Sequence, residues 1–240
     1  MANYYGTPAI VTDGLVFAVD AGNGQSYVSG SITCNNLFGP YTGSLQDDAQ
    51  YSPVGNGSWI FDGTDDFINF PDDIGINGAT EMSCFCWVNH DSLSLNEAIA
   101  VKWDYSTQGC FGFQTDNSTV GELRVFIANA VDDLGNNHTY TSNASLASTT
   151  WYYVGFVYDG SQANANRVKI YVDGVAKSTT TTGTINTSLI AATSTLKIGE
   201  FGGSLNRYWN GKIANCQVYN KALTAAEVLQ NYNATKNRFI

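Results

Sequence analysis

Short runs of apolar or alternating residues, separated by Gly, Asn, Asp and Ser, make up most of the chain. This rhythm is typical of antiparallel β-strands joined by tight turns. It predicts strands at residues 15–19, 58–61, 68–70, 81–90, 98–102, 111–115, 123–128, 151–158, 168–172, 196–200 and 212–219.

Two of these segments are apolar on both faces. In 81–90 the two faces carry Met82, Cys84, Cys86 and Val88 on one side and Phe85 and Trp87 on the other. In 151–158 they carry Tyr152, Val154, Phe156 and Tyr158 opposite Trp151, Tyr153 and Val157. A strand covered on both faces is typical of the inner part of a layered structure, so both segments are expected to be central strands.

Turn and capping residues between the apolar runs predict a hairpin and a single helix. Asp173-Gly174 signals a tight turn, so a strand is expected to begin near Val175. Thr224 and Glu227 form a T-x-x-E capping box, which predicts a short helix at 224–232. The chain is therefore expected to be an all-β, two-sheet antiparallel sandwich with one C-terminal helix. One domain at 14–232 would lie between an N-terminal arm at 1–13 and a tail at 233–240.

Composition narrows the range of partners. The formal net charge is −10, and no Lys/Arg cluster forms a basic stripe, which argues against nucleic acid and anionic membranes. Residues 1–30 lack a cationic start followed by an apolar run, so no signal peptide and no membrane insertion are expected. The 5 cysteines show neither a zinc spacing nor a dense disulfide framework, and we interpret them as small buried apolar side chains.

Four segments, read in order, resemble the laminin-G-like, concanavalin A-like lectin superfamily. They are W-I-F-D-G-T-D-D-F-I at 59–68, M-S-C-F-C-W-V at 82–88, T-W-Y-Y-V-G-F-V-Y-D-G-S at 150–161 with V-K-I-Y-V-D-G-V at 168–175, and L-K-I-G-E at 196–200 with W-N-G-K-I-A-N-C-Q-V-Y-N-K-A-L-T-A-A-E-V at 209–228. In the second segment Cys86 stands where the family has Ala. The resemblance implies a jelly-roll sandwich.

The two ends of the domain are similar to versions of this domain in tailed-phage virion proteins. The matching segments are G-L-V-F-A-V-D-A-G-N at 14–23, followed by Tyr27, and L-Q-N-Y-N-A-T-K-N-R-F at 229–239. This resemblance implies a component of the virion surface, in capsid decoration or a tail fibre, that is assembled in the host cytoplasm. Its partners would be other virion proteins or further copies of itself.

Catalytic motifs are missing from the sequence. Some superfamily members are glycanases with paired carboxylates on one strand, in the pattern E-x-D-x-x-E. None of Glu81, Glu97, Glu122, Glu200 and Glu227 fits that pattern, and no H-E-x-x-H or G-x-S-x-G motif is present. The chain is therefore expected not to be an enzyme, and glycanase is the least favoured function.

A cluster of aspartates suggests a metal site. Asp62, Asp65 and Asp66 bring three carboxylates into one turn, and closely spaced carboxylates suit a hard cation such as Ca²⁺. Calcium at the rim of the sandwich is also what the resemblance implies. The alternative is a tight turn whose Asp side chains bond to local amides. Asp132-Asp133 is a second, weaker candidate.

Glycan binding requires an aromatic platform with amides or acids beside it. Two segments provide these residue types: Trp103, Asp104 and Tyr105, and Asn206, Arg207, Tyr208 and Trp209. The alternatives are that the rings cover the edge of the core or form a subunit interface.

The N-terminal arm is unusually apolar for a solvated tail. It carries Tyr4, Tyr5, Pro8 and Ile10, which suggests that the arm, with Phe239 and Ile240, contacts a neighbouring subunit. The alternative is that the arm packs on its own sandwich. The sequence thus favours a non-enzymatic phage virion protein with a lectin-like fold and a host-surface glycan as a further partner. A free carbohydrate-binding module is the alternative.

Overall fold

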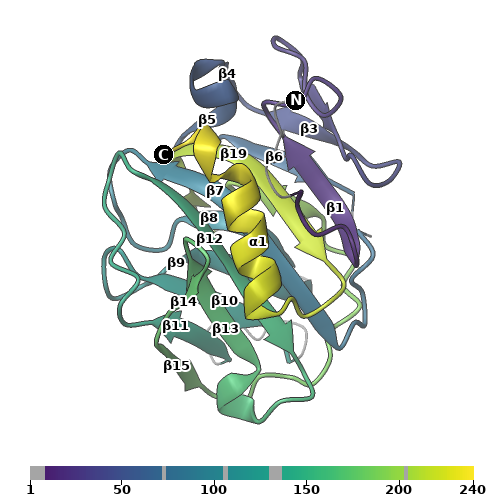
Figure 1. The fold of residues 1–240 in the computed structure, drawn as a ribbon, viewed down its shortest axis with the longest axis vertical. Helices are drawn as coiled ribbons and strands as arrows, with labels where there is room; N and C mark the ends of the chain where they lie inside the picture. The colour runs from purple at the N-terminus through teal and green to yellow at the C-terminus, as the bar shows by residue number, and fades with distance from the viewer. Residues whose placement is uncertain (1–8, 72–73, 105–107, 130–136, 203–204) are drawn as a thin grey trace, which may run out of the picture.

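Two antiparallel sheets stack face to face in the computed structural model, which describes residues 9–71, 74–104, 108–129, 137–202 and 205–240 (Figure 1). Sheet A has the order β14-β13-β12-β7-β19-β5-β4, and β1 also pairs with β19. Sheet B has the order β15-β11-β10-β9-β8-β16-β6-β3-β2. The all-β sandwich predicted from the sequence is confirmed.

The bounds of the elements are as follows. Sheet A contains β1 (Leu15–Asp20), β4 (Gln50–Ser52), β5 (Ser58–Asp62), β7 (Glu81–His90), β12 (Trp151–Asp159), β13 (Val168–Val172), β14 (Val175–Ala176) and β19 (Asn210–Tyr219). Sheet B contains β2 (Thr33–Asn35), β3 (Thr42–Gln46), β6 (Phe67–Phe70), β8 (Ala98–Asp104), β9 (Gln108–Thr115), β10 (Leu123–Ile127), β11 (His138–Thr141), β15 (Thr179–Thr182) and β16 (Leu196–Ile198). A two-stranded hairpin contains β17 (Glu200–Phe201) and β18 (Arg207–Tyr208).

The predicted strand at 196–200 is divided in two. Gly199 has a φ of +93°, a left-handed conformation that favours glycine, and a Cβ there would lie 3.0 Å from the Phe61 ring. The chain therefore leaves sheet B after β16 and starts the β17–β18 hairpin at Glu200. The hairpin carries the residues of the second predicted glycan segment.

The main core fills the space between the sheets. The inward-facing side chains of β7 that the alternation predicted, Met82, Cys84, Cys86 and Val88, belong to it, as do Val154, Phe156 and Tyr158 of β12. Truncating a core side chain, as in Phe156→Ala, would leave a cavity and typically lowers the free energy of unfolding by about 3–5 kcal/mol. The predicted division of faces in both strands is confirmed.

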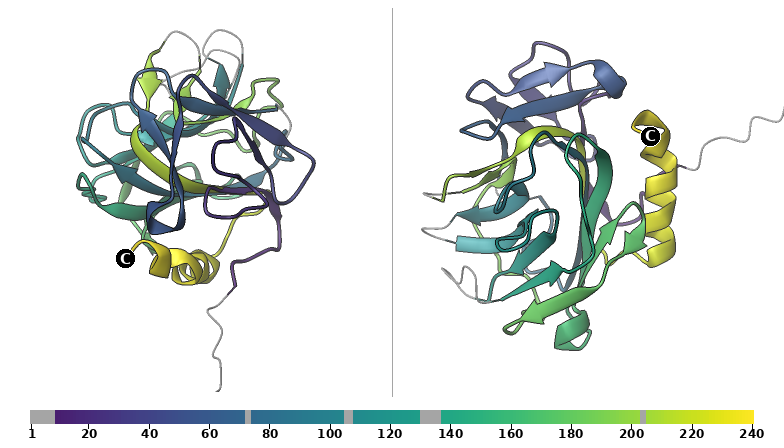
Figure 2. Two further views of the ribbon diagram at one scale, coloured as in Figure 1. Left: turned by 90° about the horizontal axis from the view of Figure 1, so that it is seen from above. Right: turned by 90° about the vertical axis from the view of Figure 1, so that its left-hand side faces the viewer.

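The opposite face of sheet A is covered by helix α1 (Ala225–Thr235), as Figure 2 shows. Thr224 accepts a hydrogen bond from the Glu227 amide, and the Glu227 carboxylate accepts one from the Thr224 amide, so the predicted capping box is confirmed. Phe85 and Trp87 of β7 pack beneath the helix, in line with their predicted face.

Ile10, Val11 and Phe239 also pack on this face of sheet A. The Val11 amide donates to Asn231 Oδ1 over 2.7 Å, and the Tyr219 hydroxyl donates to the Val11 carbonyl over 3.1 Å. The ring of Phe239 stacks 4.5 Å from Trp87, centroid to centroid. Ile10 and Phe239 are therefore partly buried on the chain's own sheet, as the alternative interpretation expects, and contact with a neighbour stays a prediction.

Three residues of the predicted arm, Tyr4, Tyr5 and Pro8, lie outside the described residues. Ile240 is 65% exposed. None of the helices in the described ranges is long and apolar enough to cross a membrane.

Candidate functional site

A polar depression of about 430 Å³ lies where three loops meet at one rim of the sandwich. The turn after β5 contributes Gly63, the segment before β8 contributes Leu95 to Glu97, and the β17–β18 hairpin contributes the rest. Its lining residues are Gly63, Leu95, Asn96, Glu97, Leu205, Asn206, Arg207 and Tyr208. We call it the Arg207 pocket. It brings together three of the predicted glycan residues: Asn206, Arg207 and Tyr208.

Two asparagines shape the pocket wall because they adopt a left-handed backbone. Asn96 has a φ of 62° and Asn206 a φ of 50°. Asn accepts this conformation more readily than most residues because its short polar side chain bonds locally. Both of these turns contribute an asparagine to the lining of the depression.

A buried glutamine fixes the polar groups of the pocket. Gln114 of β9 is fully buried, and its Nε2 donates to Asn96 Oδ1 over 3.2 Å. Its Oε1 accepts from Arg207 Nη1 over 3.1 Å. The Arg207 guanidinium also lies 5.4 Å from the centre of the Phe201 ring. One side chain thus orients a cation and an amide that are 111 positions apart in the sequence, counted from residue 96 to residue 207.

A buried acid–base pair lies beside the pocket, which Glu97 lines. Glu97 forms an ion pair with His90, and both side chains are buried. Trp209 packs edge-on against His90 with ring centroids 4.5 Å apart, and it is fully buried. Trp209 therefore supports the pocket from behind, and the prediction that it offers an exposed platform is wrong.

The first predicted glycan segment is not part of this pocket. Trp103 is buried against Phe126 and Phe201 on the outer face of sheet B, above Gly109. A Cβ at Gly109 would lie 2.2 Å from the indole, so the ring fits only over glycine. The expectation that Trp103 stacks on a sugar is therefore wrong. Asp104 is partly buried and bridges to Gly202, while Tyr105 lies outside the described residues.

The predicted metal cluster adjoins the pocket through Gly63. Each of Asp62, Asp65 and Asp66 offers an oxygen, and these oxygens all lie within 4.8 Å of one another. The turn interpretation also holds in part, because Asp62 Oδ1 accepts from the Thr64 amide over 2.7 Å. Asp66 Oδ2 accepts from the Asp62 amide over 3.0 Å. The cluster is both a hydrogen-bonded turn and a convergence of carboxylates.

The electrostatics of the cluster suit a bound cation. Asp66 is 4% exposed, and its Oδ1 has no hydrogen-bond partner among the described residues. Burial, and then the charges of Asp62 and Asp65, raise the pKa of Asp66 above its ordinary value, against hydrogen bonds from the Asp62 and Asp48 amides. A hard cation would relieve this repulsion and satisfy the orphan oxygen, so the three residues fit Ca²⁺. The second candidate pair, Asp132-Asp133, lies outside the described residues.

Tyr208 lines the Arg207 pocket and lies close to Asp65 of the aspartate cluster. Its hydroxyl pKa is raised by burial and then by the negative charges of Glu200, Asp65 and Asp47. The phenol therefore stays protonated and remains a hydrogen-bond donor at neutral pH.

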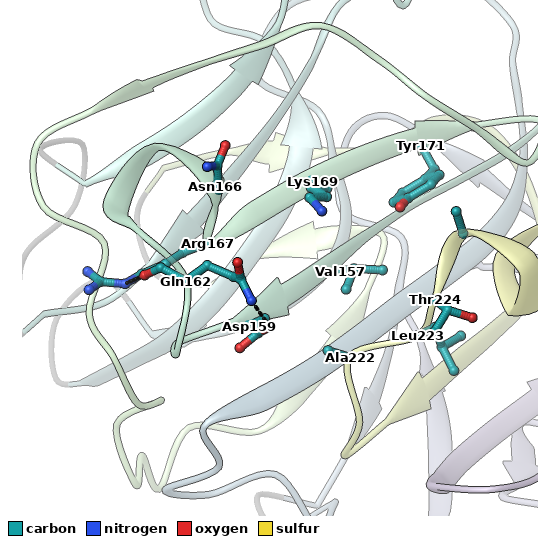
Figure 3. Close-up of a pocket in the computed structure, with 11 residues that line it drawn as sticks. Val157, Asp159, Gln162, Asn166, Arg167, Lys169, Tyr171, Ala222, Leu223 and Thr224 are labelled. Atoms are coloured by element: carbon teal, nitrogen blue, oxygen red, sulfur yellow. Dashed lines mark hydrogen bonds between the residues drawn. The ribbon is translucent and has the colours of Figure 1, made fainter.

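A second, smaller depression of about 260 Å³ lies on sheet A beside the start of α1 (Figure 3). Gln162 bonds to Asp159 over 2.8 Å there, and the Arg167 guanidinium donates to the carbonyls of Gly160, Gln162 and Ile185. These polar groups are engaged within the protein. The depression contains none of the predicted site residues.

Every glutamate has a structural partner. Glu81 accepts from the Ala222 amide, Glu122 from Thr141 and Ala144, and Glu227 caps α1. Glu97 pairs with His90 and Glu200 with Lys197.

The sequence matches a known protein family over most of its length. The family model described as the concanavalin A-like lectin/glucanases superfamily matches residues 62–229. No curated protein matches the sequence.

Among solved structures, domain 4 of the GH43 extracellular arabinanase AbnA from Geobacillus stearothermophilus, in complex with arabinotriose, superposes with a TM-score of 0.60. The identity is 17%, over 91% of this chain and 98% of that one. Trypanosoma rangeli sialidase in complex with sialic acid superposes with a TM-score of 0.66 at 14% identity, over 96% of this chain and 34% of that one. The binding domain of Paraclostridial Mosquitocidal Protein 1 superposes with a TM-score of 0.63 at 14% identity, over 92% of this chain and 52% of that one. The chain thus spans about a third of the sialidase, and these likenesses show the fold.

Proposed function

Because the chain belongs to the concanavalin A-like lectin/glucanases superfamily, we propose that it is a non-enzymatic domain that binds glycans in the Arg207 pocket. The observation that carries the proposal is the orientation of Asn96 and Arg207 by the buried Gln114. Polar groups fixed in this way lose little conformational freedom on binding, which favours recognition of hydroxyl groups.

The lining residues indicate the type of glycan. Asn96, Asn206 and Arg207 offer amide and guanidinium donors, and Tyr208 adds a half-buried ring with a hydroxyl. The single arginine lies among acids, since Glu97 lines the pocket and Asp65 lies close to Tyr208. This charge balance favours neutral sugars over anionic ones. Support also comes from the arabinanase domain of similar fold, whose structure contains arabinotriose.

Replacing Arg207 by alanine tests the glycan site. We expect at least a tenfold loss of affinity, roughly 1.4 kcal/mol, for whichever neutral oligosaccharide binds in a panel that includes arabino-oligosaccharides. Isothermal titration calorimetry measures it. Lys169→Ala, in the depression on sheet A, is the matched control and should leave binding unchanged. Equal losses in both variants, or no binding across the panel, would refute the pocket as the site.

The absence of hydrolysis is a second expectation. Glu97 is the one glutamate among the residues that line the pocket, and it is paired with His90. Glycanases that use two carboxylates need both of them beside the scissile bond. Incubation with glucans, galactans and arabinans should therefore release no reducing sugar. Release that disappears in Glu97→Gln would contradict the proposal.

We also propose that Asp62, Asp65 and Asp66 hold a calcium ion beside the pocket. The support is the convergence of their oxygens and the orphan Oδ1 of Asp66. Because Gly63 lines the pocket, the ion would rigidify the turn that forms one wall.

The biological setting that we propose is the surface of a phage virion. The segments similar to virion proteins, 14–27 and 229–239, lie together in the structure, where Arg238 bonds both oxygens of Asp20 over 2.6 and 3.0 Å. The two segments thus form one structural unit.

In this setting the domain would assemble with other virion proteins or with itself and present the pocket to host glycans. Mass spectrometry of purified particles from the source tests this setting. Peptides of this chain should copurify with particles. Recovery only as a free protein would favour a carbohydrate-binding module instead.

A further inference from the structure

Three thiols converge inside sheet A. Cys84 and Cys86 lie on β7, and Cys216 lies on the neighbouring strand β19, directly opposite Cys86. Their sulfur atoms all lie within 4.8 Å of one another. All three cysteines are free and fully buried, as the sequence predicted for the cysteines in general.

The arrangement follows from the register of the strands. Residues two apart on a strand point to the same side, so Cys84 and Cys86 face the core together. The pairing of Val218 with Cys84 and of Cys216 with Cys86 places the third thiol on the same face. Rigid central strands therefore hold the three sulfurs together.

The environment of the thiols is apolar. On the other side of β7, Val154 pairs with Cys86 and Phe156 with Cys84, and both side chains belong to the same core. The register thus places no carboxylate or imidazole from β12 opposite the two thiols. A ligand set of sulfur alone selects soft metal ions.

We propose that Cys84, Cys86 and Cys216 form a three-coordinate site for one Cu(I) ion. Binding replaces the protons of the three thiols by Cu–S bonds, because thiolates and not thiols ligate metal ions, and the three protons leave to solvent. No oxidant or reductant is needed, because copper enters as Cu(I).

Coordination number distinguishes this ion from Zn²⁺. Zinc prefers four ligands in a tetrahedron, and the described cluster offers three. Since the sulfurs are fully buried, loading requires local opening of sheet A or binding during folding, so it should be slow in the native protein.

The test compares Cu(I) binding by the intact chain and two variants under anaerobic conditions, with bathocuproine disulfonate as competitor. Samples are loaded both by long incubation and by refolding with Cu(I). We expect one ion per chain, a loss of at least a hundredfold in affinity in Cys216→Ala, and less than twofold change in Cys110→Ala. Cys110 is the matched control, because it is a buried free thiol of the same core outside the cluster.

X-ray absorption of the loaded wild-type chain gives a readout that does not depend on how well the variants fold. Three sulfur ligands around copper are expected. Fewer than three sulfurs, equal losses in both variants, or copper bound only by the denatured chain would each overturn the proposal.

Discussion

Replacing Asn231 by leucine is expected to lower the free energy of unfolding by about 2–3 kcal/mol. Asn231 belongs to α1 and is fully buried. Its Oδ1 accepts from the Val11 amide over 2.7 Å, and its Nδ2 donates to the Tyr219 hydroxyl over 3.0 Å. Leucine offers no polar atom, so the Val11 amide would remain buried without its partner. For a chain of this size the loss corresponds to roughly 4–12 °C in melting temperature.

The control for this experiment is Gln230→Leu. Gln230 is exposed and donates only to the carbonyl of Ala9, over 2.8 Å, in the described residues. Its replacement should change the melting temperature by less than about 2 °C, as surface substitutions usually do. Differential scanning calorimetry measures both variants. Equal shifts would mean that Asn231 does not anchor residues 9–11 to α1.

Calcium is expected to raise the melting temperature of the wild-type protein. It is also expected to change the sign of the effect that Asp66→Asn has on stability. With extracellular-type affinities of about 10⁻⁴–10⁻³ M, 10 mM calcium would stabilise the fold by about 1.4–2.7 kcal/mol. Without metal, Asp66→Asn should stabilise the protein, since it removes a buried charge repelled by Asp62 and Asp65. With calcium it should destabilise, since a ligand is lost.

The dependence on pH has a definite sign. The folded pKa of Asp66 lies above its unfolded value, so the native state binds more protons in the interval between them. Stability of the metal-free protein through this group therefore falls as pH rises from about 4 through the raised pKa. Calcium requires the ionised carboxylate, so its stabilisation grows over the same interval.

Thermal scans with calcium and with chelator, for wild type and Asp66→Asn, measure these effects. A wild-type melt that is indifferent to millimolar calcium would leave only the hydrogen-bonded turn.

The central strands could be predicted because most of their residues are apolar, on both faces of the strand. Both faces of β7 and β12 are apolar, so alternation marks the strand and its position at once. The strands that prediction missed are short and polar, such as β15, which consists of four threonines on the edge of sheet B. Such a strand is specified by its partner β11 more than by its own sequence.

The candidate site was only partly predictable for a related reason. Aromatic residues beside polar ones look the same in sequence whether the ring faces solvent or the core, so Trp103 and Trp209 could not be told from Tyr208. Gln114 was missed because its partners, Asn96 and Arg207, meet it only in the folded sheet. The available signal was a glutamine within the apolar segment F-G-F-Q-T at 111–115.

The position of β19 determines when the protein can fold during synthesis. This strand, residues 210–219, pairs with β1, β5 and β7, which the ribosome makes long before it. Sheet A therefore stays open in the nascent chain, with apolar strand edges exposed, until residues 210–219 have emerged. Contacts of such long sequence separation slow folding and prolong exposure to aggregation. The interval before β19 leaves the ribosome is thus the one in which chaperone protection should matter most.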